Sequence, residues 1–459
     1  MKLRILQPLD LAAGGLALAL VFIISVVILI GTWEGVQVNI VTADENGEIG
    51  PLSTIMLRFS EPVDQTIVQS LFSIQPKTPG KLDWVDAKTL RFTPLEPLQP
   101  GADYQIQMNA GYLGNKNLLL RFNHLWLLHV RQPQIAYLAS VNNNIQLWAV
   151  DLDGKYPHRL GNFNKAIFDF DAAPTGEYLV FSALNDKQGT DLWVVDRSGN
   201  SLHLLASCGA DRCTSPAISP DSQQVAYTRE AAPITPSMPT GAPRIWVVNV
   251  QSGENRPLYS DPQIIGFGPA WSPDGKYITS YDGVQAVIRI VSIGTGEQFT
   301  LPSATGGDMP TWSPDSKSIL FTDEAVSPDG SSSWSVIKMA DVATGDISVW
   351  IGKSDTQDYQ YGDLAWAPNP DEIIIGLRLP PDFTSRGLLL VRPNDPGGPI
   401  VANDPQFLYQ TPKWDLWGKE VLLQEEMITG LHTTDIAIWE TGMTQPHVVA
   451  QGTWPHWLP

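Results

Sequence analysis

The sequence predicts an all-β protein that begins with a membrane-spanning helix and continues into a small β-sandwich and a large β-propeller. Three observations support this prediction. Residues 11–30 carry no charge, residues 36 to about 130 alternate apolar and polar side chains in short runs, and two short elements recur from residue 133 onward. The chain of 459 residues exceeds the roughly 250 to 300 residues that one core normally holds, so more than one domain is expected.

The charge balance excludes one class of partner. The sequence has 48 Asp and Glu against 29 Lys and Arg, a formal net charge of −19, and no run of basic residues. Proteins that bind nucleic acid need a clustered basic face. We therefore expect no nucleic-acid partner, and the acidic balance is typical of a soluble surface.

The first predicted element is a transmembrane helix over residues 11–31. Twenty uncharged residues form a helix of about 30 Å, which matches the hydrocarbon core of a bilayer. Lys2 and Arg4 precede this segment, and the next basic residue after it is Arg58. Because basic residues stay on the cytoplasmic side, we expect residues 1–10 in the cytoplasm and the rest of the chain outside, held at the cell membrane by one span.

A cleaved signal peptide is the alternative interpretation of this segment. Its apolar region is usually about 7 to 15 residues long and ends in small residues such as A-x-A. Here the apolar run is longer and continues into IGTWEG, where no such site occurs. The sequence therefore favours an uncleaved anchor.

The second predicted element is a β-sandwich over residues 34–130. Its short alternating runs, such as STIMLRFSEPV and ADYQIQM, are broken by turn segments such as ENGEIGP and LQPG, a pattern typical of half-buried strands. The stretch resembles bacterial Ig-like domains of the SbsA type. The resemblance rests on Phe59-Ser60-Glu61-Pro62-Val63, Trp84, Leu90-Arg91-Phe92-Thr93-Pro94 and Leu98-Gln99-Pro100-Gly101-Ala102-Asp103-Tyr104. It implies a fold but names no ligand.

The third predicted element is a ring of repeats over residues 133–459. A turn followed by an apolar strand, as in SPDGKYITSY, occurs six times, and a strand that ends near a Gly turn, as in IWVVNVQSG, occurs seven times. The sequence ends in Thr453–Pro459, which matches the PAWSP frame up to its second proline, and Gln134–Tyr137 supplies the strand that should follow. A last strand that joins the first repeat closes a β-propeller, so we expect seven blades.

The repeats also resemble a known family. Trp271–Gly275 read WSPDG, and Leu192–Asp196 read LWVVD; this combination is similar to that of the TolB-type, WD-repeat-like propellers. The resemblance implies a β-propeller over about the last seventy per cent of the chain. Because TolB itself is usually described with six blades, a six-bladed ring is the alternative.

The carboxylates of the repeated frame, Asp274 and Asp315, invite a catalytic interpretation. In Ser272-Pro273-Asp274-Gly275, however, each residue type suits its place in a type I turn, and Asp caps backbone amides there. The frame also occurs as Ala-Pro-Thr-Gly and Ala-Pro-Asn-Pro, which lack the carboxylate. We therefore expect a structural role for both aspartates.

The two cysteines, Cys208 and Cys213, occur together in ASCGADRCTSP. Their spacing suits a small loop closed by a disulfide, which the outside of a membrane permits. Metal or redox chemistry is the alternative, but a metal site needs more ligands nearby, and the seven His residues are scattered. We expect a disulfide, with no metal and no cofactor.

No catalytic motif occurs in the sequence. It has no G-x-S-x-G, no H-E-x-x-H, no Walker loop and no dinucleotide Gly fingerprint. We therefore expect a protein that is not an enzyme. An acid and a base supplied by different blades stay open as an alternative, because such groups need only spatial proximity.

The expected ligand surface is one mouth of the central channel, where the loops entering the innermost strands converge. In this interpretation those loops carry Phe267, Asp308, Tyr361, Asp363, Tyr409 and Trp454. The alternative is that the aromatic residues pack between blades. The tryptophans that recur at one place in the repeat are expected in the blade core; they are Trp271, Trp312, Trp366, Trp414 and Trp457.

Two hypotheses of function follow. The first is a membrane-anchored, extracytoplasmic binding or scaffold protein, in which the Ig-like module lifts the propeller off the membrane and the propeller recruits a protein, peptide or glycan. The second is an extracytoplasmic propeller hydrolase or lyase that acts on polysaccharide or peptide.

Overall fold

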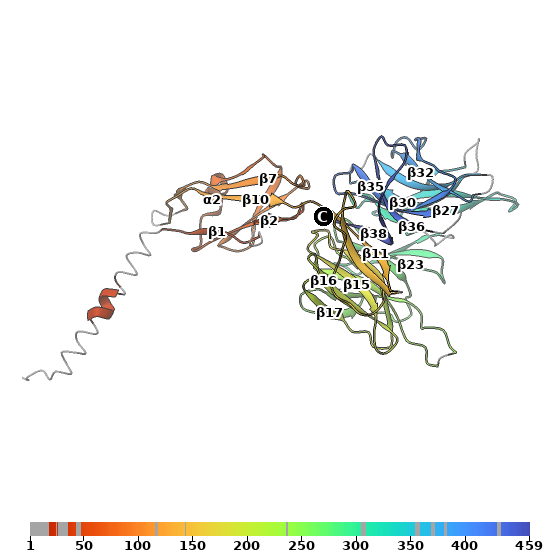
Figure 1. The fold of residues 1–459 in the computed structure, drawn as a ribbon, viewed down its shortest axis with the longest axis horizontal. Helices are drawn as coiled ribbons and strands as arrows, with labels where there is room; N and C mark the ends of the chain where they lie inside the picture. Colours follow the sequence, from red (N-terminus) through yellow and green to blue (C-terminus); the bar gives the residue numbers. More distant parts are fainter. Residues whose placement is uncertain are drawn as a thin grey trace, which may run out of the picture. The chain divides into compact units, whose positions relative to one another are not determined.

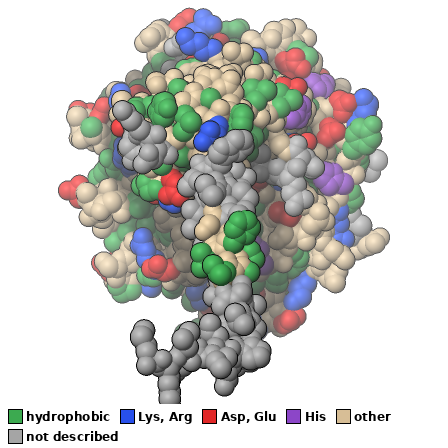
Figure 2. All heavy atoms as spheres, turned by 90° about the vertical axis from the view of Figure 1, so that its left-hand side faces the viewer, with side chains coloured by type: hydrophobic (Ala, Val, Ile, Leu, Met, Phe, Trp, Pro, Cys, Tyr) green, Lys and Arg blue, Asp and Glu red, His purple; other side chains and the backbone are tan. Residues whose placement is uncertain are grey.

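The computed structural model describes residues 18–23, 25, 35–42, 47–114, 118–142, 144–235, 237–303, 309–353, 359–368, 372–380, 383–428 and 433–459. The chain divides into two compact units, Met1–Arg131 and Gln132–Pro459, and both consist mainly of β-strands (Figure 1). Figure 2 shows acidic, basic and apolar side chains interspersed on the face that it presents. The two units are described separately below.

The predicted membrane helix lies mostly outside the described residues. Of residues 11–31, only 18–23 and 25 are described; they are helical, and their side chains are exposed. The predicted cytoplasmic segment, 1–10, lies entirely outside. Within the described part of the chain, no helix is long and apolar enough to cross a membrane.

The first unit is a β-sandwich. One sheet has the order β1(Val38–Ile40), β3(Ile55–Phe59), β6(Thr89–Pro94), β5(Gly80–Trp84), and the other β2(Glu48–Ile49), β10(His124–Val130), β7(Asp103–Met108), β4(Phe72–Gln75). Side chains from both sheets, among them Phe59 and Ile106, form one buried core, as the alternation of each strand requires. A small hairpin, β8(Gly111–Tyr112) with β9(Leu119–Leu120), and helix α2(Gln65–Leu71) complete the unit.

Asp64 sets the start of helix α2. Its carboxylate accepts hydrogen bonds from the backbone N–H of Thr66, at 3.0 Å, and of Ile67, at 3.2 Å. These are amides that lack a partner within the helix. The carboxylate at this strand end is therefore used to cap a helix.

The second unit consists of four-stranded antiparallel meanders. The strands of the first half are β11(Gln134–Val141), β12(Asn144–Asp151), β13(His158–Arg159), β14(Ile167–Ala172), β15(Tyr178–Leu184), β16(Thr190–Asp196), β17(Leu202–Ala206), β18(Arg212–Ile218), β19(Gln224–Glu230), β20(Arg244–Asn249), β21(Asn255–Pro257), β22(Phe267–Trp271), β23(Tyr277–Asp282), β24(Val287–Ser292) and β25(Gln298–Pro302). Those of the second half are β26(Thr311–Trp312), β27(Ser318–Val326), β28(Ser333–Asp341), β29(Ile347–Ile351), β30(Gln360–Trp366), β31(Ile373–Arg378), β32(Arg386–Val391), β33(Ile400–Ala402), β34(Phe407–Trp414), β35(Glu420–Met427), β36(Thr434–Glu440), β37(His447–Gln451) and β38(Thr453–Leu458).

Most meanders follow the chain in sequence order, as in β22-β23-β24-β25. The meanders β14–β17 and β18–β21 join into one larger sheet through a short parallel contact between Thr190 and Arg212, and β30–β33 joins β34–β37 in the same way between Arg386 and Leu408. Buried clusters formed by side chains of neighbouring meanders fill the spaces between them. This is the propeller-like arrangement that the repeats predict.

The last strand of the chain pairs with the first strand of the unit. Strand β38 lies antiparallel to β11, with Gln134 opposite Leu458 and Ala136 opposite His456. The first meander therefore consists of β13, β12, β11 and β38, the closure that the truncated repeat predicts. It covers a strand edge that would otherwise be open.

Arg197 strengthens this closure from the neighbouring meander. Its Nη1 donates hydrogen bonds to the carbonyl oxygens of Leu458 and Pro459, at 2.9 and 2.6 Å, and its Nη2 donates to that of Gln132, at 2.9 Å. Gly176 makes the close approach possible, because a Cβ at this position would lie 1.7 Å from the Pro459 oxygen. One side chain thus binds both ends of the unit.

A bulge recurs in the innermost strands. Residues with a left-handed backbone occur at the same place in five of the described inner strands; they are Ser215, Gly268, Asp363, Thr411 and Trp454, with φ of 52, 59, 46, 49 and 55°. At each of these places the register with the second strand shifts. Such bulges bend a strand and re-aim its side chains.

The backbone N–H groups at the bulges are bound by side chains of the preceding meander. Asp169 accepts from Ser215 at 2.7 Å, and Thr228 accepts from Gly268 at 3.0 Å. Gln424 accepts from Trp454 at 3.1 Å. The backbone N–H groups at the bulges therefore find their hydrogen-bond acceptors in the preceding meander rather than in their own.

The recurrent tryptophans join neighbouring meanders. The indole N–H of Trp271 donates to the carbonyl of Ala217 at 2.9 Å, that of Trp414 to Ala365 at 3.1 Å, and that of Trp457 to Lys413 at 2.8 Å. In each pair the acceptor is the residue before the tryptophan position of the preceding inner strand. These side chains pack and bond between meanders, in the core that the repeat predicts for them.

The aspartates of the repeated frame bind their own turns. Asp315 accepts a hydrogen bond from the Ser313 hydroxyl at 2.7 Å and from the Lys317 amide at 3.1 Å. Asp274 makes the same two contacts with Ser272 and Lys276. Both carboxylates therefore hold the turn between the first two strands of a meander.

We predict that Arg197→Met destabilises the second unit. The change removes the four hydrogen bonds that this charged group donates, to Gly176, Leu458, Pro459 and Gln132, so the free energy of unfolding should fall by about 2 kcal/mol. Arg256→Met, at an exposed position in β21, is the matched control and should change it little. Urea unfolding of the full chain measures both, and equal losses would contradict the role of Arg197 in closure.

A second prediction concerns the turn aspartates. The Ser313 hydroxyl and the Lys317 amide lower the pKa of Asp315. A carboxyl group with a depressed pKa stabilises the fold above its unfolded pKa of about 4, and this contribution is lost as the pH falls through the depressed value. Asp315→Ala should therefore be less stable than wild type at neutral pH, by no more than about 0.5 kcal/mol because solvent screens this 56% exposed side chain, and the difference should narrow as the pH falls below about 4. A difference that stays constant with pH would contradict this assignment.

Candidate functional site

One end of the second unit collects the segments that lead into the innermost strands. Because successive strands of a meander are antiparallel, the hairpins between the second and third strands lie at this same end. We call it the entry face: the described residues that lead into β14, β18, β22, β26, β30, β34 and β38, together with those hairpins. The predicted ligand surface belongs to it.

Exposed apolar side chains gather on the entry face. Phe168, Phe267 and Trp454 lie near the starts of inner strands and are 48, 39 and 53% exposed. The hairpins add five more exposed apolar side chains, which are Ile145, Ile234, Met238, Val284 and Val326. Among the other described residues of this unit, large exposed apolar side chains also occur at the opposite end and along the outer strands; they are Tyr156, Leu204, Ile347, Val349, Ile400, Met443 and Val448. What distinguishes the entry face is that it holds three of the four exposed aromatic side chains of the described unit, a residue type enriched where proteins bind one another.

The predicted site residues differ in their exposure to solvent. Phe267 and Trp454 are exposed on the entry face, and the Phe267 ring packs edge-on against Tyr281, with centroids 5.6 Å apart. Tyr361 is half-buried among apolar side chains. Asp308 lies outside the described residues.

The other two predicted residues have internal partners. Tyr409 is 1% exposed, and its hydroxyl donates to Gln445 at 2.9 Å, so its ring packs in the core, as the alternative interpretation expects. Asp363 pairs with Arg386 and accepts from the backbone N–H of Thr411 at 3.4 Å. Its carboxylate is thus engaged by β32 and β34, within and between meanders.

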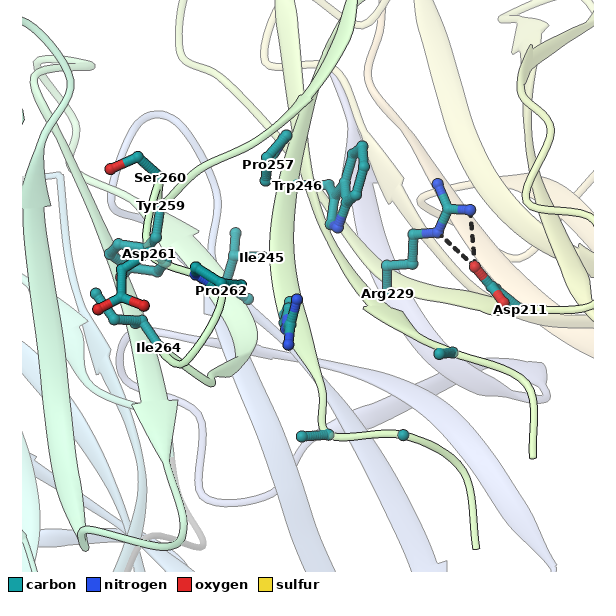
Figure 3. Close-up of a pocket in the computed structure, with 14 residues that line it drawn as sticks. Asp211, Arg229, Ile245, Trp246, Pro257, Tyr259, Ser260, Asp261, Pro262 and Ile264 are labelled. Atoms are coloured by element: carbon teal, nitrogen blue, oxygen red, sulfur yellow. Dashed lines mark hydrogen bonds and ion pairs between the residues drawn. The ribbon is translucent and has the colours of Figure 1, made fainter. Parts of the chain in front are cut away.

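A pocket of about 380 Å³ opens on the entry face of the meander β18–β21. Figure 3 shows Arg229 and Asp211 on one side of the Trp246 ring and the segment Tyr259–Ile264 on the other. The described residues of the long insertion between β19 and β20 contribute Ala231, Gly241 and Ala242 to its lining. The insertion thus forms part of a pocket wall.

The charged wall of this pocket is held in place by its own contacts. Arg229 Nε donates to Asp211 Oδ2 at 2.9 Å, and the guanidinium carbon lies 4.7 Å from the centroid of the Trp246 ring. Asp211 also accepts from the Ala232 amide at 3.0 Å. The guanidinium therefore covers one face of the indole through a cation–π contact, and that face is not free to stack on a ligand.

Tyr259 forms the apolar part of the pocket. Its ring is 8% exposed, and burial raises the pKa of its hydroxyl, which lies 3.3 Å from Ser280 Oγ. The phenol therefore stays neutral at physiological pH. Beside it the exposed side chains of Arg244 and Asp261 place charges of both signs at the rim.

A second pocket, of about 490 Å³, lies on the entry face of the neighbouring meander β14–β17. Its lining includes Phe163, Trp193 and Asp191. The segment between the two pockets is closed by a disulfide between Cys208 and Cys213. The Cys208 amide donates to Asp191 at 2.7 Å, so the disulfide loop is tied to the wall of the second pocket, while Asp211 of the same loop belongs to the first.

A further cluster, which the sequence interpretation missed, lies on three inner strands. Lys413 Nζ is 2.5 Å from His456 Nε2, and His456 Nδ1 is 3.2 Å from Asp171 Oδ1. A signal for it exists in the sequence: the residue before the tryptophan is Ala or Thr in PAW and PTW but Lys in PKW and His in PHW. No set of three or more His, Cys, Asp or Glu suited to a metal ion occurs among the described residues.

The fold defines the class of protein: an all-β chain with an Ig-like sandwich and a β-propeller, which exposes aromatic side chains at its entry face. The TolB beta propeller domain matches residues 126–367, and the Bacterial Ig-like domain matches residues 37–122. The chain belongs to the TolB beta propeller domain family. No curated protein has a sequence that matches it.

Several solved structures share the fold. A puromycin-hydrolyzing peptidase from Mycobacterium tuberculosis matches with a TM-score of 0.50 and 13% identity, over 70% of this chain and 54% of that one. A prolyl endopeptidase matches with a TM-score of 0.50 and 12% identity, over 71% and 50%. TolB from Acinetobacter baumannii has a TM-score of 0.40 and 16% identity, over 92% and 100%. This chain thus spans about half the length of the two peptidases, and at these identities the likeness concerns the fold alone.

Proposed function

We propose that this chain is a membrane-anchored, extracytoplasmic binding protein whose seven-bladed propeller recruits a peptide segment of a partner protein at its entry face. The observation that carries the proposal is the grouping at that face of three of the four exposed aromatic side chains of the described unit, in a protein of net charge −19. A soluble surface of this charge has no need to expose Phe168, Phe267 and Trp454 together, unless a partner covers them.

The strand pairing supports the proposed ring of seven blades. The described strands group into four-stranded meanders that start at β14, β18, β22, β26, β30 and β34, and one more that β38 and β11 form together. A six-bladed ring would leave one of these meanders outside the circle. The proposed anchor is residues 11–31, and residues 34–130, which we propose are of the SbsA type, serve as a spacer between anchor and propeller.

A peptide suits the first pocket better than a glycan. Sugars stack on open aromatic faces, whereas Arg229 covers one face of Trp246. The lining adds Ile245, Ile264 and two prolines, which favour apolar side chains, and charges of both signs at the rim suit the polar groups of a peptide.

An extracytoplasmic hydrolase or lyase is the second candidate. The contacts among Lys413, His456 and Asp171 support a catalytic role inside the propeller. None of these residues, however, lines either entry-face pocket. The proposed binding function therefore does not depend on them.

The test uses the full chain in detergent, screened against a library of random 12-residue peptides. We expect selected peptides to bind with measurable affinity, and the double variant Phe267→Ser, Trp454→Asn to weaken binding by at least about tenfold, the effect of about 1.4 kcal/mol. Asn is chosen at 454 because it tolerates the left-handed backbone there.

The matched control is Leu204→Ser with Val448→Ser, which removes exposed apolar side chains from the outer strands β17 and β37 and should leave the affinity unchanged. Equal losses in both double variants, or no selected peptides, would overturn the proposal. Cleavage of the peptides, followed by mass spectrometry, would favour the hydrolase instead.

A further inference from the structure

The residue before the tryptophan position is equivalent in every inner strand. The pairing with the second strand establishes this: Asp171 lies opposite Val180, Lys413 opposite Leu422, and His456 opposite Ala136, each one place before the tryptophan position. The equivalent residues in the other inner strands are small; they are Ala217, Ala270, Thr311 and Ala365. We call this level of the channel the inner layer.

The three titratable residues of the inner layer lie on inner strands that follow one another around the ring, at the place where β38 closes it. Strand β34 carries Lys413, β38 carries His456, and β14 carries Asp171. They make a row in which Lys413 Nζ contacts His456 Nε2 at 2.5 Å and His456 Nδ1 contacts Asp171 Oδ1 at 3.2 Å. The other carboxylate oxygen of Asp171 accepts from the Ile218 amide at 2.8 Å, which fixes its orientation.

These contacts define which nitrogen of His456 carries a hydrogen. Asp171 accepts, so His456 carries its hydrogen on Nδ1, and the lone pair of Nε2 faces the amine of Lys413. The Phe170 ring, with its centroid 4.7 Å from that of His456, holds the imidazole in place. Lys413 therefore donates to a neutral imidazole rather than directly to a carboxylate.

Burial makes the amine unusually easy to deprotonate. It lowers the pKa of Lys413 to about 8, although the charge of Asp171 acts in the opposite direction. Burial and the charge of Lys413 also lower the pKa of His456 against the effect of its bond to Asp171. A neutral amine beside a neutral imidazole is the arrangement that a nucleophilic lysine needs.

Part of the row is accessible to solvent. The side chains of His456 and Asp171 keep 17 and 24% of their surface exposed, and inner strands of a propeller surround a central channel. Ala217, Ala270 and Thr311 occupy the same level and are only half-buried. Their small side chains leave room beside the row that larger residues would fill.

We propose that Lys413 is a nucleophilic amine that binds a small aldehyde or ketone as an imine in the inner layer of the channel. The amine nitrogen forms a bond to the carbonyl carbon, and the carbonyl π electrons move to oxygen. His456 Nε2 takes a proton from the nitrogen and gives it to that oxygen, which yields the neutral carbinolamine. The imidazole then passes the second N–H proton to the hydroxyl group, which leaves as water while the C=N bond forms. Asp171 stabilises the transient imidazolium and acts as a positioning residue.

This site is distinct from the proposed peptide surface. It lies inside the inner layer, needs no residue of the entry-face pockets, and takes a small carbonyl compound rather than a peptide. Its reaction consumes one carbonyl and one amine and releases one water, so no oxidant or further reactant is needed.

The test is reductive trapping on the full chain in detergent, with propionaldehyde and cyanoborohydride at pH 7.5. At this pH an amine of pKa about 8 is about one quarter neutral, against about one thousandth for an ordinary lysine. Peptide mapping should therefore show Lys413 alkylated at least about tenfold faster than Lys317, whose side chain is 78% exposed. Lys413 modified no faster than Lys317 would overturn the proposal, and this comparison needs no variant.

Two variants separate chemistry from packing. His456→Gln removes the proton acceptor, and Asp171→Asn keeps the shape but removes the charge. His456→Gln should slow the alkylation of Lys413 at least about fivefold and leave that of Lys317 unchanged, in protein whose thermal unfolding stays cooperative. Asp171→Asn should slow it once the rate is divided by the fraction of neutral amine, because the lost charge also lowers the pKa of Lys413. If Lys413 keeps its full rate in a folded His456→Gln variant, the imidazole does not activate it, and the proposed mechanism is wrong.

Discussion

The pairing of β38 with β11 is the contact on which the second unit depends. It places a strand from the far end of the sequence beside the first strand of the unit, with Ile135 opposite Trp457. Without it β11 would keep an open edge, and the meanders β34–β37 and β14–β17 would lose the strand that separates them. The contacts of Arg197 with Gln132, Leu458 and Pro459 add charged hydrogen bonds to the same seam.

The pairing of β38 with β11 also brings together titratable side chains from three different meanders. Lys413, His456 and Asp171 are brought together only because β38 lies between β34 and β14. Elsewhere in the inner layer the residues are small, and neighbouring meanders are joined instead by indole N–H bonds and by side chains that bind the bulge amides. These joints hold the starts of the inner strands in fixed positions, so the entry face is presented on a rigid scaffold, as a binding surface requires.

The Ig-like and propeller-like β-architecture could be predicted from the sequence because its repeats are local. Turn residues such as Ser313 and Asp315, apolar strands, and a final half-repeat specify a meander and its closure without knowledge of distant contacts. Phe267 and Trp454 lie exposed at the starts of inner strands, a position that follows from the repeat, and their role as ligand contacts stays a prediction. The predicted span of residues 11–31 lies mostly outside the described residues, and the anchor stays a prediction.

The roles of individual side chains were harder to predict. Asp363 and Tyr409 occur where a ligand contact is expected, but the bulge turns the first toward Arg386 and Thr411, and the second packs in the core. A bulge changes side-chain direction without a consistent residue type, because Ser, Gly, Asp, Thr and Trp all occupy it here. The sequence does not predict the row of Lys413, His456 and Asp171, because these residues are far apart in sequence and become neighbours only when the propeller closes.

Ring closure is tested most directly by deleting residues 453–459 and following amide hydrogen exchange in the full chain. The account predicts that β11 and the meanders on either side of the seam, β14–β17 and β34–β37, lose protection by at least about tenfold, the effect of about 1.4 kcal/mol in local stability, while the strands of the first unit keep theirs. Unchanged protection in β11 after the deletion would contradict the central role of the closing strand.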